Sequence, residues 1–208
     1  MFKIAITGPE STGKTTLSEK LAQHFNTDFV PEYSRTYLEN FEGQYTEEDV
    51  AKIAEGQYNL ILEEEKKSPE ILIADTETIV CKIWVEYVFK HSNKTIDAIL
   101  KKQDFDLYLL CDIDLLWVYD PLRENPDIEE RKELFDIYKK TLTEMNLPFE
   151  IVNGDNEERL DNAIKIISKY FPQVMGTNYV DDNGIDSHFL SKVGAEMNKS
   201  RNFAQKKI

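Results

Sequence analysis

The sequence predicts an α/β fold, a three-layer sandwich in which a five-stranded, mainly parallel sheet has helices on both faces. Short apolar runs of strand length alternate along the chain with segments whose apolar residues recur at helical spacing. The first apolar run, residues 2–6, ends in a glycine-rich turn that leads directly into a helix. The 208 residues are enough for one such domain with a substantial core.

The glycine-rich turn matches the P-loop pattern G-x-x-x-x-G-K-[ST], with a strand before it and a helix at residues 16–25 after it. We therefore expect a P-loop NTPase fold that binds ATP through backbone amides and the start of the helix. Lys14 should reach the β and γ phosphates, and the Thr15 hydroxyl should ligate Mg²⁺. The expected ATP-binding residues of the loop are Gly8, Glu10, Ser11, Thr12, Gly13, Lys14, Thr15 and Thr16.

The charge and composition of the chain argue against a protein that binds nucleic acid or a membrane. The net charge is −14, and no basic stripe or apolar stretch of membrane-spanning length occurs, so we expect neither a nucleic-acid nor a membrane partner. The two cysteines, Cys81 and Cys111, lie in apolar surroundings without a C-x-x-C pattern. Buried reduced thiols and a chain that opens without a signal peptide favour the cytoplasm.

The second strand, residues 28–30, ends at Pro31, and ligands bind at the carboxyl ends of parallel strands. Glu32 and Arg35 are therefore expected to meet a substrate, the alternative being an ion pair in a surface loop. The next helix follows a Thr46 cap. Its apolar stripe contains Gln57. We expect this side chain to hydrogen-bond a backbone group, the less favoured alternative being contact with a ligand.

The third strand, residues 71–74, ends at Asp75, where an acid in a P-loop protein holds Mg²⁺ or its water. The alternative is a cap for the helix at residues 79–89, and both roles are compatible. That helix is aromatic, and Trp84 is either core or a stacking partner for a planar ring.

The fourth strand, residues 106–111, precedes a polar stretch that predicts a mobile lid at about 119–131. Arg123 and Arg131 are placed to contact the transferring phosphoryl group, the alternative for Arg131 being pairs with helical glutamates. After a helix around residues 134–142 and a fifth strand at 149–152, Gly154 and Arg159 are candidates to frame the adenine. Residues 1–171 form the predicted P-loop kinase domain. Residues 172–208 form an appendage, with a helix at 187–198, that is either docked or a disordered tail.

These motifs resemble those of the NadR-type ribosylnicotinamide kinase (nicotinamide riboside kinase) family. The resemblance spans residues 3–170 and is carried by the P-loop, by Pro31-Glu32-Tyr33-Ser34-Arg35, and by a W-x-x-D-x-x-R motif of Trp117, Asp120 and Arg123. The conjunction is more specific than the P-loop alone. Some members also carry an adenylyltransferase domain or a DNA-binding domain. Because this sequence starts at the P-loop strand and has no H-x-G-H motif, we expect neither adenylyl transfer nor transcriptional repression.

The resemblance implies that the γ-phosphate of ATP passes to the 5′-hydroxyl of nicotinamide riboside, giving nicotinamide mononucleotide in NAD salvage. Asp75 is the first candidate for the base that takes the hydroxyl proton, and Glu32 is the second. Trp84 or Trp117 would stack on the cationic pyridinium ring. The remaining candidates for substrate contacts are Tyr33, Arg35 and Asp120.

Two other functions remain open. The first is phosphorylation of another nucleoside or nucleotide; a monophosphate acceptor would need further arginines, and Arg35 is the only arginine before the lid. The second is an ATP-binding regulatory module that hydrolyses ATP slowly. The sequence predicts no oligomeric state.

Overall fold

The computed structural model describes residues 1–39, 41–120 and 125–175. The chain divides into two compact units, residues 1–160 and 161–208. The lid arginine Arg123 and the predicted helix at residues 187–198 lie outside the described residues. The predicted domain boundary after residue 171 and the lid limits stay predictions.

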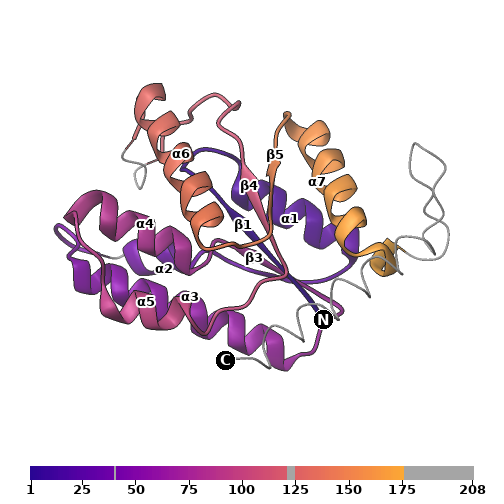
Figure 1. The fold of residues 1–208 in the computed structure, drawn as a ribbon, viewed down its shortest axis with the longest axis horizontal. Coiled ribbons are helices and arrows are strands. Elements are labelled where there is room, and N and C mark those ends of the chain that lie inside the picture. Colours follow the sequence, from indigo (N-terminus) through magenta and orange to yellow (C-terminus); the bar gives the residue numbers. More distant parts are fainter. Residues whose placement is uncertain (40, 121–124, 176–208) are drawn as a thin grey trace. The chain divides into compact units, whose positions relative to one another are not determined.

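Five strands form one sheet in the order β2-β3-β1-β4-β5 (Figure 1). All four pairings between neighbours are parallel, which confirms the predicted sheet. The chain places β2 and β3 on one side of β1 and then β4 and β5 on the other. Ligands bind in such sheets where the direction of strand addition changes, and the loop after β1 lies at this point. The strands are β1 Phe2–Thr7, β2 Phe29–Val30, β3 Ile71–Asp75, β4 Leu107–Cys111 and β5 Phe149–Val152.

Helices cover both faces of the sheet, as Figure 1 shows for α3, α4 and α5 on one side and α1 on the other. Two caps explain where long helices begin. Thr46 and Asp49 form a capping box at α3, which confirms the predicted cap, and Asp127 accepts from two amides at the start of α6. The helices are α1 Lys14–Phe25, α2 Tyr33–Leu38, α3 Glu47–Lys66, α4 Thr78–Phe89, α5 Lys94–Leu100, α6 Ile128–Glu144 and α7 Asn156–Tyr170, followed by a 3-10 turn at Pro172–Met175.

The core follows from the side-chain alternation of the strands. Alternate residues of β3 and β4, such as Leu72, Ala74 and Leu110, pack against α3, α4 and α6 in one buried cluster. Both cysteines are buried free thiols, as predicted, and burial raises the pKa of Cys111 to about 11. Packing of this apolar interior holds the strands in place. The loops that follow the carboxyl ends of the strands are therefore held near one another.

The short helix α2 was not predicted, because its six residues carry no apolar stripe. The side chain of its N-cap residue, Glu32, accepts no capping hydrogen bond from a backbone amide of the helix. Gln57 of α3 holds its start. The Gln57 carboxamide accepts from the Tyr33 amide at 2.7 Å and donates to the carbonyl oxygens of Pro31 and Thr76 at 3.3 Å each. The expectation that Gln57 satisfies backbone groups is confirmed.

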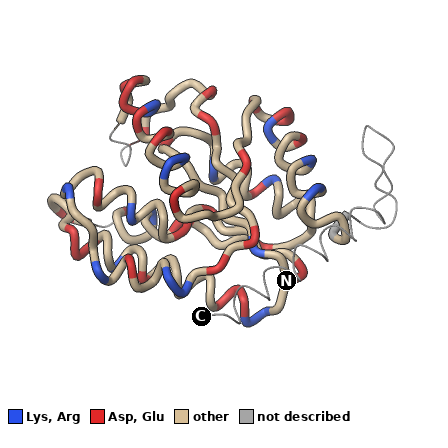
Figure 2. The backbone as a smooth tube through the Cα atoms, in the orientation of Figure 1, with Lys and Arg blue, Asp and Glu red and all other residues tan. Residues whose placement is uncertain are grey.

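Charged residues of both signs are spread over the helices rather than gathered on one of them, as the colours along the backbone show (Figure 2). Among the helices of the described residues, none combines the length and the apolar content needed to cross a bilayer.

Candidate active site

The loop after β1 has the backbone of an anion cradle. Gly8 and Gly13 have φ values of 128° and 75°, and Ser11 between them lies at 57°. A side chain at Gly8 would also place its Cβ 3.0 Å from the Cys111 carbonyl oxygen, so the close approach of β4 requires glycine there. Successive amides in such a turn converge on one side of the loop, at the start of α1.

Lys14 is folded against this loop. Its ammonium group donates to the carbonyl oxygens of Gly8, at 3.0 Å, and Pro9, at 2.8 Å. The Thr12 hydroxyl donates to the same Pro9 carbonyl at 2.8 Å and closes the turn. The loop backbone therefore holds the Lys14 ammonium group next to the loop amides. Both are the groups that we expect to bind the phosphates of ATP.

Asp75, at the end of β3, is 1% exposed, and neither of its carboxylate oxygens has a hydrogen-bond partner among the described residues. Burial raises the pKa of this carboxyl to about 6; the nearby Thr15 hydroxyl offsets part of the rise, and Glu32 adds to it. A buried carboxylate with two unengaged oxygens beside a hydroxyl provides the hard oxygen ligands that Mg²⁺ prefers. Asp75 and Thr15 therefore fit the predicted metal site.

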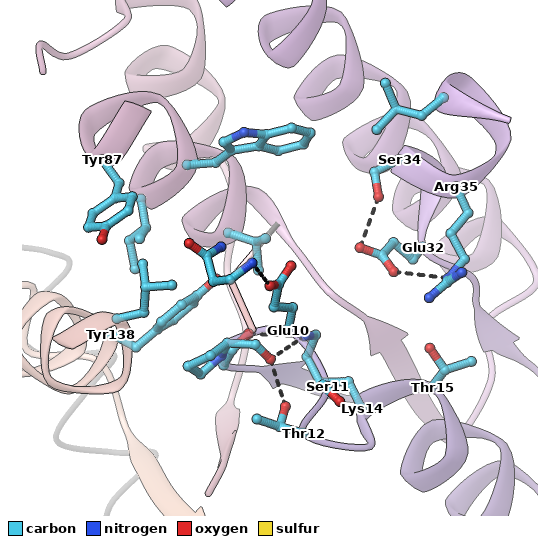
Figure 3. Close-up of a pocket in the computed structure, with 18 of the residues that line it drawn as sticks. Glu10, Ser11, Thr12, Lys14, Thr15, Glu32, Ser34, Arg35, Tyr87 and Tyr138 are labelled. Atoms are coloured by element: carbon cyan, nitrogen blue, oxygen red, sulfur yellow. Dashed lines mark hydrogen bonds and ion pairs between the residues drawn. The ribbon is translucent and has the colours of Figure 1, made fainter. Parts of the chain in front are cut away.

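Glu32 lies on the pocket wall, held by its own segment. Its carboxylate accepts from the Ser34 hydroxyl at 2.9 Å and lies 3.5 Å from the Arg35 guanidinium (Figure 3). Arg35 also pairs with Asp120 at 3.1 Å, so the segment after β2 is tied to the segment after β4. The carboxylate is thus oriented on two sides while its side chain stays 21% exposed.

Three contacts hold the segment after β4 to the phosphate loop. The Val118 amide donates to the Ser11 hydroxyl at 3.0 Å, and the Asn125 amide donates to the Glu10 carboxylate. Arg131 is 2% exposed and donates to the Ser11 carbonyl oxygen at 3.3 Å. The predicted reach of Arg131 to the phosphoryl group stays a prediction, and the structure places its guanidinium against the loop backbone.

A cavity of about 450 Å³ opens from the phosphate loop, a size suited to a small organic ligand. Figure 3 shows Tyr87 and Tyr138 on one side, Glu32, Ser34 and Arg35 on the other, and Glu10 between them. The Trp84 indole donates to the Tyr45 hydroxyl at 2.9 Å, which fixes that ring in the wall. Away from the phosphate loop the lining is mostly apolar and aromatic: Leu38, Phe41, Gly43, Tyr45, Val80, Ile83, Trp84, Tyr87, Val88, Leu134 and Tyr138.

Several predicted site residues lie outside this lining. The Tyr33 ring packs against Gly56 of α3, and Trp117 and Asp120 belong to the segment after β4. Arg159 is 3% exposed and donates to the carbonyl oxygens of Gly154, at 2.9 Å, and Val152, at 3.1 Å, so its guanidinium supports the loop after β5. Roles for these residues and for Gly154 in ligand binding stay predictions.

Sequence reasoning missed four aromatic residues of the lining: Phe41, Tyr45, Tyr87 and Tyr138. Tyr138 follows the apolar stripe of α6 and reads as core. Tyr87 belongs to the aromatic helix predicted at residues 79–89, in which only Trp84 was singled out for stacking. The topology supplies the missing signal, because α4 and α6 pack on the same face of the sheet next to the phosphate loop.

A family model described as an AAA domain matches residues 3–159. The chain belongs to this AAA domain family. Among its relatives it is 29% identical over 171 residues to the trifunctional NAD biosynthesis/regulator protein NadR of Escherichia coli strain K12, and 28% over 173 residues to NadR of Salmonella typhimurium strain LT2. The alignments cover 79% and 80% of this chain but 41% and 42% of the relatives, so the chain spans less than half of their length.

Solved structures of proteins named NadR are also similar to this chain. A crystal structure of NadR in complex with NR matches with a TM-score of 0.71 at 26% identity, over 81% of this chain and 51% of that one. A structure of NadR with NAD and AMP-PNP matches with a TM-score of 0.68 at 26% identity, over 82% and 49%. Thymidylate kinase from Ehrlichia chaffeensis, at 15% identity and a TM-score of 0.59 over 80% and 97%, shares the fold.

Proposed function

We propose that this chain is an ATP-dependent ribosylnicotinamide kinase, which phosphorylates the 5′-hydroxyl of nicotinamide riboside to nicotinamide mononucleotide in cytoplasmic NAD salvage. The similarity to NadR, including a structure of NadR with NR and one with the ATP analogue AMP-PNP, supports both substrates.

One observation carries the proposal. A phosphate-binding loop and an aromatic cavity form a single pocket, and the oriented carboxylate of Glu32 lies on its wall. Such a pocket can hold a triphosphate and a ring-bearing alcohol at once, with the alcohol directed toward the γ-phosphate. Positioning of the two reactants supplies much of the rate enhancement in phosphoryl transfer.

The charges of the pocket favour a nucleoside over a nucleotide. Of the described lining residues, Lys14 and Arg35 are the basic ones. Lys14 lies on the phosphate loop and Arg35 is engaged by Glu32 and Asp120. A nucleoside monophosphate would bring a dianion to a wall that is mostly aromatic and aliphatic. Among the described lining residues it would not find the paired arginines that its phosphate would need.

We infer different roles for the two carboxylates. Sequence reasoning ranked Asp75 first as the base, but Asp75 is buried and does not line the pocket, whereas Glu32 does. We infer that Glu32 accepts the 5′-hydroxyl proton as the oxygen bonds to the γ-phosphorus and the bond to the β-phosphate oxygen breaks. Thr15 and Asp75 would hold Mg²⁺, which supplies neutralisation of charge on the phosphate oxygens.

The proposal is tested by ADP release with Mg²⁺ and ATP against nicotinamide riboside, common nucleosides and nucleoside monophosphates. Stimulation by nicotinamide riboside above all other acceptors is expected. Stimulation by a monophosphate alone would favour a nucleotide kinase, and slow release that no acceptor changes would favour a regulatory ATPase.

A further inference from the structure

Tyr138 of α6 combines deep burial with a hydroxyl that the fold does not use. Its side chain is 5% exposed and lines the pocket, and its ring packs in the core cluster with Leu134 and Tyr108. Among the residues that the structure describes, the Tyr138 hydroxyl has no hydrogen-bond partner. Unlike the fully buried polar atoms that lack a partner, this hydroxyl is open to the pocket, so it is free to meet a ligand. A phenylalanine would fill the same place in the core cluster without it. The folded protein alone therefore gives no reason for tyrosine here.

The side chain points into the ligand space. In Figure 3 Tyr138 extends from α6 toward Glu10 of the phosphate loop, across the same pocket that Tyr87 lines. A ligand that fills this pocket would bury the hydroxyl completely, and it would then need to offer a polar atom as its partner.

The surroundings of this hydroxyl are acidic. Burial raises the pKa of Tyr138 well above its ordinary value, and Glu77, Glu32 and Glu10 raise it further, so the group stays protonated. The basic residues of the lining do not offset this, because Lys14 is folded onto the phosphate loop and Arg35 pairs with Glu32 and Asp120. A carboxylate brought here would meet carboxylates, while a neutral amide would not.

We propose that the Tyr138 hydroxyl determines acceptor specificity, by hydrogen bonding to an uncharged polar group of the bound riboside and disfavouring one that carries a carboxylate there. The inference rests on the proposed riboside kinase function and adds a selection between ring substituents. It predicts a preference for the carboxamide-bearing nicotinamide riboside over the carboxylate-bearing nicotinic acid riboside.

The test compares Tyr138→Phe with Tyr108→Phe, which removes a buried hydroxyl 3.5 Å from Gln103 and outside the pocket lining. In Tyr138→Phe we expect the KM for nicotinamide riboside to rise roughly fivefold to tenfold, as for one lost hydrogen bond. The KM for ATP should stay constant, the carboxamide preference should shrink, and the ligand-free melting temperature should stay equal or rise. Tyr108→Phe should leave both KM values and the preference unchanged.

The outcomes separate the inference from the function on which it rests. If the wild type phosphorylates nicotinamide riboside and Tyr138→Phe keeps its KM and its preference, the inference alone is overturned. A fall in melting temperature with equal losses for both ribosides would make Tyr138 a structural residue and would also overturn it. If the wild type phosphorylates neither riboside, the proposed function fails, and the inference fails with it.

Discussion

The guanidinium group of Arg131 lies 3.3 Å from the carbonyl oxygen of Ser11, which ties the first turn of α6 to the phosphate loop across 120 residues of sequence. The same group lies 3.4 Å from the Leu115 carbonyl oxygen. Because Arg131 is 2% exposed, its charge acts at short range through a poorly screened interior. It therefore adds positive potential behind a loop that must bind phosphates.

Replacing Arg131 by methionine should weaken ATP binding roughly tenfold and lower the free energy of unfolding by about 1.5–3 kcal/mol, because charge-assisted hydrogen bonds to the loop are lost. Calorimetric titration with a non-hydrolysable ATP analogue and chemical denaturation measure the two effects. Lys132→Met is the matched control, since Lys132 pairs only at the surface with Glu129. Equal affinities of both variants for the analogue would contradict the role given to Arg131.

The Glu32→Gln change tests the base. It preserves shape but removes proton acceptance, so turnover should fall by roughly 10²–10⁴-fold while the KM for ATP stays within a factor of two or so. Steady-state kinetics with saturating riboside measure this. Ser34→Ala removes one hydrogen bond to Glu32 and should cost about tenfold or less. Near-normal turnover in Glu32→Gln would move the role of base elsewhere.

Asp75→Asn should separate activity from stability. The variant should lose Mg²⁺-dependent turnover by at least about 10²-fold, because a ligand of the metal and its charge are gone. The ligand-free protein should become more stable by about 1–3 kcal/mol at pH 8. Burial, which raises the pKa of Asp75 from 3.8 to about 6, makes the charged carboxylate unfavourable in the folded state at that pH, and asparagine carries no charge. Thermal unfolding in the presence of a chelator checks the second effect. A destabilised variant would mean that Asp75 stabilises the fold.

The Gly56→Ala change has two opposite effects on stability, a gain in helix propensity and a steric clash. Alanine favours a helix interior by about 1 kcal/mol over glycine. The new Cβ would lie 2.1 Å from the Tyr33 ring, however, and overpacking of this kind costs roughly 1–3 kcal/mol. We expect net destabilisation and a shifted α2, measured by the melting temperature and the riboside KM. Glu55→Ala, at an exposed neighbouring position of α3, should change neither, and a more stable Gly56→Ala would show that Tyr33 moves freely.

Asp49 should contribute an acid-sensitive share of stability. Hydrogen bonds from the Thr46 hydroxyl and amide and from Tyr37 hold the pKa of this carboxyl well below its usual range. A depressed pKa stabilises the folded state above the unfolded-state value of about 4 and loses that contribution as the pH falls further. Asp49→Asn should therefore melt below the wild type at pH 7, and the gap should narrow below pH 4. A constant gap across that range would contradict the assignment.

The sequence predicts the phosphate-binding half of this protein well, because its chemistry is local. A strand, a glycine-rich loop and a helix occupy residues 2–25 without a break, and Asp75 ends an uninterrupted apolar strand. The acceptor half is assembled from residues far apart in the chain. Trp84 and Tyr138 come from α4 and α6, and Tyr45 comes from the loop before α3. Helical apolar spacing is the same whether a residue faces a core or a cavity.

Two further features of the structure leave no pattern in the sequence. Helix α2 is too short to show a periodic apolar pattern. Its start is held by Gln57, whose carboxamide oxygen accepts a hydrogen bond from the Tyr33 amide, 24 residues earlier in the chain. Arg159 and Arg131 each donate to backbone carbonyl oxygens of a loop, a role that no sequence pattern distinguishes from ligand binding. Their predicted contacts with ligands stay predictions.

The most direct test of the proposed function follows the phosphorus atom itself. The protein is incubated with Mg²⁺, nicotinamide riboside and ATP labelled at the γ-phosphate, and the products are separated and identified by mass spectrometry. The label should appear in nicotinamide mononucleotide, in an amount equal to the ADP formed. Label released only as inorganic phosphate, at one rate with and without the riboside, would contradict the account.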